Sequence, residues 1–209
     1  MGASRPVVYL PQSASGERQL VEGLRRGEVA CYRQLYDLYA PRLGRTLERL
    51  YRDPHLAQDA VQATFLAVFR NIHHFDGRST LLTWMTRIAL REGGRLSRRQ
   101  ARAQRMAESL PPASPRPWGE EQHDDRQRLR RLEALLDELP LEKRMALLLF
   151  EVEGFSVQEI ADITGEPRGT VLSRLSRTRA ELRQALSEGR EASPHQSMTS
   201  RSGTSSHHV

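Results

Sequence analysis

The sequence predicts an all-α protein with two small helical domains joined by a flexible linker, the second of them a helix-turn-helix domain. Apolar residues recur at helical spacing through most of the chain, glycine and proline are sparse inside those segments, and alternating β-branched runs are absent. Residues 100–127, rich in proline, serine and mixed charge, interrupt this periodicity as a linker does. We therefore expect a disordered arm at 1–16, a first domain at 17–99, the linker at 100–127, a second domain at 128–186 and a disordered tail at 187–209.

The chain is basic, and its positive charge is almost entirely arginine. Its 209 residues carry a formal net charge of +6 with a pI near 10.2, and Lys143 is the only lysine. Arginine suits bidentate contact with a polyanion such as DNA, with an arginine-rich genome as the alternative explanation. Cys31 is the only cysteine, which excludes an intrachain disulfide and a cysteine zinc cluster. Without a long apolar run or a secretion-signal layout, we expect a cytoplasmic protein with no membrane insertion.

The first three helices are predicted from their apolar faces. Residues 17–26 form a short amphipathic helix. In residues 28–50, Pro41 should start a new segment or kink the helix. The inward face of that helix comprises Tyr32, Leu35, Tyr36, Tyr39, Leu43 and Leu47. The third helix, at 53–72, should bury Ala57, Ala60, Val61, Thr64, Phe65, Val68 and Phe69.

The third helix carries a second stripe roughly opposite its core face. This stripe is partly apolar and holds few long charged side chains: Asp59, Gln62, Ala63, Leu66 and Arg70. A mixed surface of this kind suits docking onto a helix of a partner protein. The alternative is the solvent face of an ordinary amphipathic helix, which spacing by itself does not exclude.

A polar loop at 73–80 leads into a basic helix at 81–99. The loop contains an Asp-Gly turn, and Ser79 or Thr80 could cap the helix that follows. Leu82, Trp84, Met85, Ile88, Ala89 and Leu96 form the apolar side of that helix, and Arg87, Arg91, Arg95, Arg98 and Arg99 lie mainly along another face. An arginine face beside a polar loop favours a surface that follows a nucleic-acid strand, with a simple solvated face as the alternative.

The second domain begins with two amphipathic helices and ends in a helix-turn-helix pattern. The helices lie at 127–139 and 141–152, the latter with Met145, Leu148, Leu149 and Val152 on its core side. In 154–179, Ser156 and Glu159 form a capping box, Gly165 ends the short helix and Pro167 starts the next one. Val171 and Leu175 should face inward, and Arg168, Thr170, Ser173, Arg174 and Arg177 outward. Such a second helix enters the major groove of DNA, although a helical hairpin with solvated arginines would show a similar pattern.

The order of these segments resembles the extracytoplasmic-function (group 4) sigma factors of bacterial RNA polymerase, in the sigma-70 family. The resemblance covers most of the predicted helical chain and rests on four stretches: YRQLYDLYAPRL (Tyr32–Leu43), the helix at Asp53–Ile72, FDGRSTLLTWMTRIA (Phe75–Ala89) and the second domain from LDELPLEK at Leu136 to Leu186. The sequence departs from the family at Arg91, where asparagine is common, and at Gly93-Gly94, which should bend the basic helix.

The resemblance implies a promoter-specificity subunit with no catalytic residues, cofactor or metal. Its implied partners are core RNA polymerase, through the β′ coiled coil and the β flap, the single-stranded −10 and duplex −35 promoter elements, and an anti-sigma factor. The residues that match the polymerase-binding segment are Asp59, Gln62, Ala63, Phe65, Leu66 and Arg70. Those that match the −10 segment are Phe75, Asp76, Arg78, Ser79, Thr80, Trp84, Arg87, Arg91, Arg95 and Arg98. Those that match the −35 reader are Ser156, Arg168, Gly169, Thr170, Ser173, Arg174 and Arg177.

Two other kinds of protein fit parts of the pattern. A free-standing helix-turn-helix regulator would bind DNA without polymerase, normally as a dimer, but the sequence shows no coiled-coil heptads. A metalloenzyme would need a site drawn from Asp53, His55, Asp59, His73 and His74, but no HExxH-like pair is present.

Overall fold

The computed structural model describes residues 14–107, 131–132 and 134–191, and over these residues it contains helices and no strand. The all-α class is therefore confirmed. The first helix already begins at Ala14, inside the segment expected to be an arm. The rest of that arm, most of the expected linker and the tail from residue 192 lie outside the described residues.

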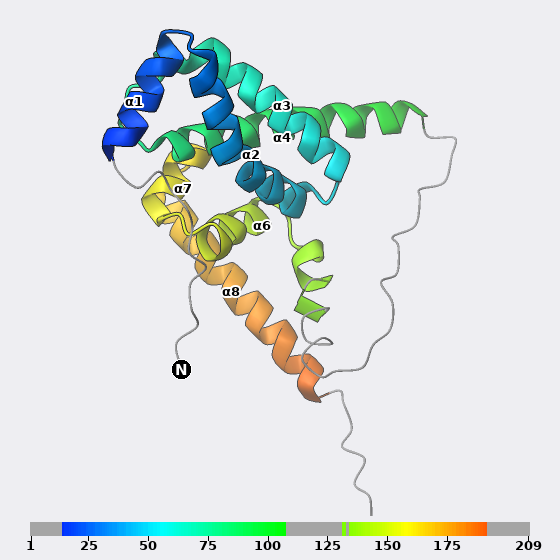
Figure 1. Ribbon diagram of the computed structural model, residues 1–209. Coiled ribbons are helices and arrows are strands. Elements are labelled where there is room, and N and C mark those ends of the chain that lie inside the picture. The colour runs from blue at the N-terminus through cyan, green and yellow to red at the C-terminus, as the bar shows by residue number, and fades with distance from the viewer. Residues whose placement is uncertain (1–13, 108–130, 133, 192–209) are drawn as a thin grey trace, which may run out of the picture.

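The first half consists of four α-helices whose apolar faces meet in one core (Figure 1). They are α1 (Ala14–Arg25), α2 (Val29–Tyr51), α3 (Pro54–Asn71) and α4 (Leu81–Ala107), with the short 3-10 helix η1 (Ile72–His74) after α3. The Asp53 side chain starts α3 by accepting hydrogen bonds from the N–H groups of His55 and Leu56, and Pro54 fills a first-turn position that needs no donor. α2 runs through Pro41, so the expected new segment there is wrong.

The second half is built from shorter helices. Residues 131–132 and 134–138 are helical, and α6 (Leu141–Leu147) continues directly into one π-helical turn, η2 (Leu148–Val152). α7 (Val157–Thr164) and α8 (Arg168–Glu191) form the helix-turn-helix. The π turn adds one residue to the helical repeat, which leaves Val152 43% exposed while Glu153 and Phe155 are buried. The expected core position of Val152 is therefore wrong.

The two halves pack directly against each other. α7 contacts α4, α6 contacts α2, and α8 extends away from the first four helices (Figure 1). At the centre of this contact, Arg42 Nε lies 2.9 Å from a carboxylate oxygen of Glu153, and the Thr46 hydroxyl donates to the other oxygen at 2.7 Å. The Arg42 guanidinium also lies 5.5 Å from the centre of the Phe155 ring. Arg42, Thr46 and Glu153 are therefore largely shielded from water at this contact.

Candidate nucleic-acid and partner interfaces

The stripe predicted for docking lies on the open side of α3. Asp59, Gln62, Leu66 and Arg70 are exposed, with Leu66 at 57%, whereas Ala63 and Phe65 are partly buried. We call Asp59, Gln62, Ala63, Leu66 and Arg70 the docking stripe. Beside it, Phe65 contacts Tyr36 and Phe69 contacts Tyr32, each with ring centres 4.8 Å apart.

Two residues expected in the core lie on this same surface. Tyr36 is 50% exposed and Phe69 is 57% exposed, so their assignment to the core is wrong. Each ring covers its partner on one side and meets solvent on the other, because the pairs close the outer edge of the α2–α3 contact. Together with Leu66, which is 57% exposed, they place three large exposed apolar or aromatic side chains on α2 and α3, and exposed apolar side chains that gather in this way are typical of a protein-binding surface.

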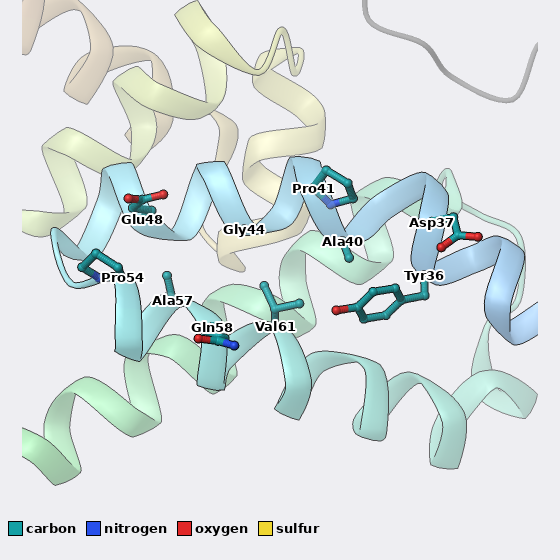
Figure 2. Close-up of a pocket in the computed structure, with 10 residues that line it drawn as sticks. All are labelled: Tyr36, Asp37, Ala40, Pro41, Gly44, Glu48, Pro54, Ala57, Gln58 and Val61. Atoms are coloured by element: carbon teal, nitrogen blue, oxygen red, sulfur yellow. The ribbon is translucent and has the colours of Figure 1, made fainter.

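A groove of about 460 Å³ runs between α2 and α3 next to the docking stripe. Small residues open it: Ala40 and Gly44 on α2 face Ala57 on α3. Figure 2 shows the Tyr36 ring across one end and Pro54 at the other, with Asp37 and Glu48 along the α2 side. The groove depends on two helices packing side by side, so no single stretch of sequence indicated it.

The loop at 75–80 begins with a buried aromatic residue and continues with exposed polar residues. Phe75 is only 5% exposed and packs on Trp84 with ring centres 5.4 Å apart. Its position is that of a core residue, which does not support the expected contact between Phe75 and DNA. Beyond it, the Asp76 carboxylate accepts a hydrogen bond from Arg78 N–H at 3.1 Å, and Gly77 takes a φ of 73° that favours glycine.

The end of this loop starts α4. Thr80 caps the helix, because its hydroxyl accepts a hydrogen bond from Thr83 N–H at 3.1 Å. Asp76, Arg78 and Thr80 are exposed and Ser79 is half-buried. The loop therefore presents an exposed ion pair to solvent, in which Arg78 Nε lies 3.2 Å from a carboxylate oxygen of Asp76, and both groups can hydrogen-bond base edges.

Four arginines follow the loop along one side of α4. Arg87, Arg91, Arg95 and Arg98 are exposed and recur at helical spacing, while Trp84 on the same helix is half-buried. Glu92 partners two of them, at 2.9 Å from Arg95 and 3.7 Å from Arg91. Arg87 donates to the backbone oxygen of Asp162 in α7, so in this arrangement it is held by the second half of the molecule.

The helix-turn-helix has the local structure that the sequence predicts. The Ser156 hydroxyl accepts from Glu159 N–H, the Glu159 carboxylate accepts from Ser156 N–H, and Gly165 ends α7 with a φ of 72°. Arg168, Gly169, Thr170, Ser173 and Arg177 are exposed, and Val171 and Leu175 are buried. Ser156 is exposed, with its hydroxyl engaged in the capping box.

Arg174 does not face freely outward as expected. Its side chain is 17% exposed, and both terminal nitrogens bind the carboxylate of Glu166 in the turn. This hydrogen bonding lowers the pKa of Glu166. Leu172, which the sequence interpretation missed, is 47% exposed on the outer face of α8. A leucine at this spacing reads as core, although apolar side chains in a major groove can contact thymine methyl groups.

Within the part of the chain that the structure describes, no three His, Cys, Asp or Glu side chains gather as a metal site would require. Asp53, considered above as a ligand, caps α3 instead. None of the described helices is long and apolar enough to span a membrane.

Family models match both halves of the chain. Residues 35–103 match a model described as Sigma-70 region 2, and residues 129–182 match one described as Sigma-70, region 4. The chain is 32% identical over 182 residues to the RNA polymerase sigma-H factor of Pseudomonas aeruginosa, covering 81% of this chain and 93% of that protein. The chain belongs to the sigma-70 family, as an extracytoplasmic-function sigma factor.

Other relatives are also sigma factors. The sigma factor CarQ of Myxococcus xanthus is 30% identical, over 80% of this chain and 96% of its own. The sigma factor SigE of Mycolicibacterium smegmatis is 34% identical over 160 residues, and the match spans 61% of that longer protein. Among solved structures, the sigma factor RpoE of Bartonella quintana, in complex with the anti-sigma factor NepR, aligns with a TM-score of 0.61 at 27% identity, over 76% of this chain and 98% of RpoE.

Membership of the family defines the activity. This sigma factor associates with core RNA polymerase, binds promoter DNA and directs promoter-specific initiation of transcription. Sigma factors are non-enzymatic initiation factors. The chemistry of its surfaces is therefore that of binding: apolar contact with a protein partner, and arginine and hydroxyl contact with DNA.

Proposed function

We propose that each described surface of this sigma factor has a separate task in initiation. The docking stripe binds the coiled coil of the polymerase β′ subunit. The loop at 75–80 and the arginines of α4 hold the melted −10 strand, and the exposed face of α8 reads the −35 duplex while its domain meets the β flap. The protein works in the cytoplasm, has no enzymatic activity and is restrained by an anti-sigma factor.

The arrangement around α4 carries this proposal. Exposed polar groups of the loop lead directly into the exposed series Arg87, Arg91, Arg95 and Arg98. A strand whose bases are captured at the loop would have its phosphates along these guanidinium groups, which bind phosphate in bidentate fashion. The exposed set on α8 includes Thr170 and Arg177, which suit contacts to phosphates and base edges in a major groove.

Restraint by an anti-sigma factor is supported by the similar structure of RpoE, whose crystals contain NepR. The cytoplasmic location is supported by the sigma factor homologues, which act with RNA polymerase in the cytoplasm.

The decisive experiment is reconstitution. Purified protein is added to core RNA polymerase with genomic DNA, and transcription start sites are mapped. We expect a small set of sites that share −35 and −10 sequences. Transcription no different from that of core polymerase would contradict the proposal, and tight duplex binding without polymerase would favour a free-standing regulator instead.

A matched pair of leucine variants tests the docking stripe. Leu66→Asp places a charge at the centre of the stripe, where Leu66 is 57% exposed, so the fold should tolerate it. Removing one partner of a buried ion pair leaves an unpaired buried charge, which costs about 3–5 kcal/mol. The new carboxylate would be buried unpaired in the same way, so we expect at least a hundredfold loss of core binding by fluorescence titration. Leu38→Asp, at a site 40% exposed on α2, is the control and should bind normally. Equal binding by both variants would place the polymerase contact elsewhere.

A further inference from the structure

Both ends of the loop at 75–80 are held by one helix from a distant part of the chain. Arg25, at the end of α1, donates from Nη2 to the backbone oxygen of Phe75 at 2.5 Å. Glu17, in the first turn of the same helix, accepts from the backbone N–H of Leu81 at 3.0 Å. One α1 side chain therefore holds the beginning of the loop, and another holds its end.

The Glu17 contact satisfies a backbone N–H that its own helix leaves without an acceptor. Leu81 is the first residue of α4, and an N–H in that position has no carbonyl acceptor within its helix. The negative charge of Glu17 also lies at the positive end of the α4 dipole. Thr80 caps a different donor, the N–H of Thr83, so Glu17 supplies an acceptor that the loop itself does not provide.

The helix that carries these side chains is firmly seated. Leu20, Val21 and Leu24 of α1 are 4%, 6% and 1% exposed, and the Tyr32 hydroxyl donates to the Leu24 backbone oxygen at 3.0 Å. Positions 17 and 25 lie about 12 Å apart along a helix that rises about 1.5 Å per residue. Because α1 is a rigid helix, it fixes the separation of the two loop ends that it contacts. The exposed residues Asp76, Arg78 and Thr80 lie between these ends in the chain.

We infer that Glu17 and Arg25 are positioning residues for promoter recognition, which hold the loop in the shape that captures a base of the single-stranded −10 element. They act through the backbone of Phe75 and Leu81 and do not touch DNA. This inference rests on the proposed role of the loop. It extends the −10 site to α1, a helix that contributes none of the predicted contact residues.

Glu17 gives a test because a general charge effect and a positioning role predict opposite changes in affinity for DNA. Removing a carboxylate from a protein of net charge +6 should by itself strengthen attraction to DNA. If Glu17 positions the loop, Glu17→Ala instead weakens binding of holoenzyme to a matched fork-junction −10 DNA about tenfold, as loss of one charge-assisted hydrogen bond would. Glu17→Gln keeps an acceptor oxygen and should stay within about threefold of wild type. Glu22→Ala, exposed on the same helix, is the control.

Arg25 is tested by salt dependence. A residue that binds phosphate directly would lower the slope of log affinity against log salt by about one when removed. A positioning residue lowers affinity for the matched DNA and leaves that slope unchanged. We expect the second result for Arg25→Ala, partial rescue by Arg25→Lys, and no effect of Arg26→Ala, whose side chain pairs with Glu28 at the surface.

The experiment measures discrimination between matched DNA and DNA with one substituted −10 base, with core polymerase present. Loss of discrimination in Glu17→Ala and Arg25→Ala, at unchanged core affinity, supports the inference. Behaviour equal to the Glu22→Ala and Arg26→Ala controls overturns it, as does a changed salt slope for Arg25→Ala. Should Glu17→Ala fail to fold, a tenfold loss in the folded Glu17→Gln variant would overturn the hydrogen-bond role. If Asp76→Ala and Arg78→Ala discriminate normally, the proposed role of the loop itself is wrong.

Discussion

Gly93 lies in the middle of α4 because the ring of Tyr51 occupies the space that a side chain would need. A β-carbon at Gly93 would lie 2.5 Å from Cε2 of Tyr51, whereas one at Gly94 would approach the nearest atoms only to 3.4 and 3.6 Å. The Tyr51 hydroxyl donates to the Leu90 backbone oxygen at 3.2 Å, and burial raises the pKa of Tyr51 to about 12. At this position the glycine serves the contact between α2 and α4, and α4 continues through it.

The two glycines should therefore respond oppositely to alanine. Gly93→Ala forces Tyr51 from its site, and overpacking of this kind costs about 1–3 kcal/mol. Gly94→Ala meets only ordinary contacts and should gain up to about 1 kcal/mol from helix propensity. Urea unfolding of both variants measures these changes. A Gly93→Ala variant as stable as Gly94→Ala would show that Tyr51 moves aside freely.

At the scale of elements, the Glu166–Arg174 pair connects the turn between α7 and α8 to α8 itself. The carboxylate follows Gly165 in the turn, and the guanidinium lies on α8 with both terminal nitrogens on it. Hydrogen bonding from Arg174, the largest influence, lowers the pKa of Glu166 and raises that of Arg174. The pair therefore links the turn to α8 across eight positions of the chain.

This pair should make the domain sensitive to acid. Because the pKa of Glu166 is lower in the folded state, its contribution is complete above the ordinary value of 4.5 and is lost as the pH falls through the folded value. Glu166→Gln should be less stable than wild type at pH 7, and the difference in unfolding free energy should shrink below about pH 4.5. A difference that stays constant down to pH 2 would contradict this coupling, and an Arg174→Ala double-mutant cycle isolates the pair.

At the scale of the whole molecule, direct contacts between side chains and backbone join the two halves of the structure. Glu153 reaches Arg42 and Thr46, the Thr83 hydroxyl donates to Glu159, and Arg87 donates to Asp162. The −35 and −10 elements lie about 25 base pairs apart, or about 85 Å at about 3.4 Å per pair. Since α7 touches α4 directly, the proposed reading of both elements at once requires the halves to separate.

Two ion pairs between the halves should contribute unequally to holding the halves together. The side chains of Arg42 and Glu153 are 15% and 7% exposed, and loss of one partner of a buried pair costs about 3–5 kcal/mol. The Arg52–Asp137 pair is 42% and 52% exposed, and such pairs contribute about 0–1 kcal/mol. Small-angle X-ray scattering should therefore show a larger radius of gyration for Glu153→Ala, with Asp137→Asn like wild type. An unchanged radius for Glu153→Ala would mean that apolar contacts alone hold the halves together.

Much of the candidate site could be predicted because it is encoded locally. The capping box of Ser156 and Glu159, the glycine stop at Gly165 and the Thr80 cap each depend on residues within a few positions of one another. The docking stripe and the arginine series of α4 are repeats along single helices. Short-range hydrogen bonds and helical periodicity leave a signal in the sequence whatever the rest of the chain does.

Only the tertiary structure decided features that join distant segments. It buried Phe75 and left Phe69 at the surface, because each ring was placed by a partner on another helix. It joined Glu153 to Arg42, and it brought Glu17 and Arg25 to the ends of the loop at 75–80. The sequence by itself determined the helices, their caps and the family of this sigma factor. Which faces met was decided by packing, since contacts between distant residues have no periodic signature along the chain.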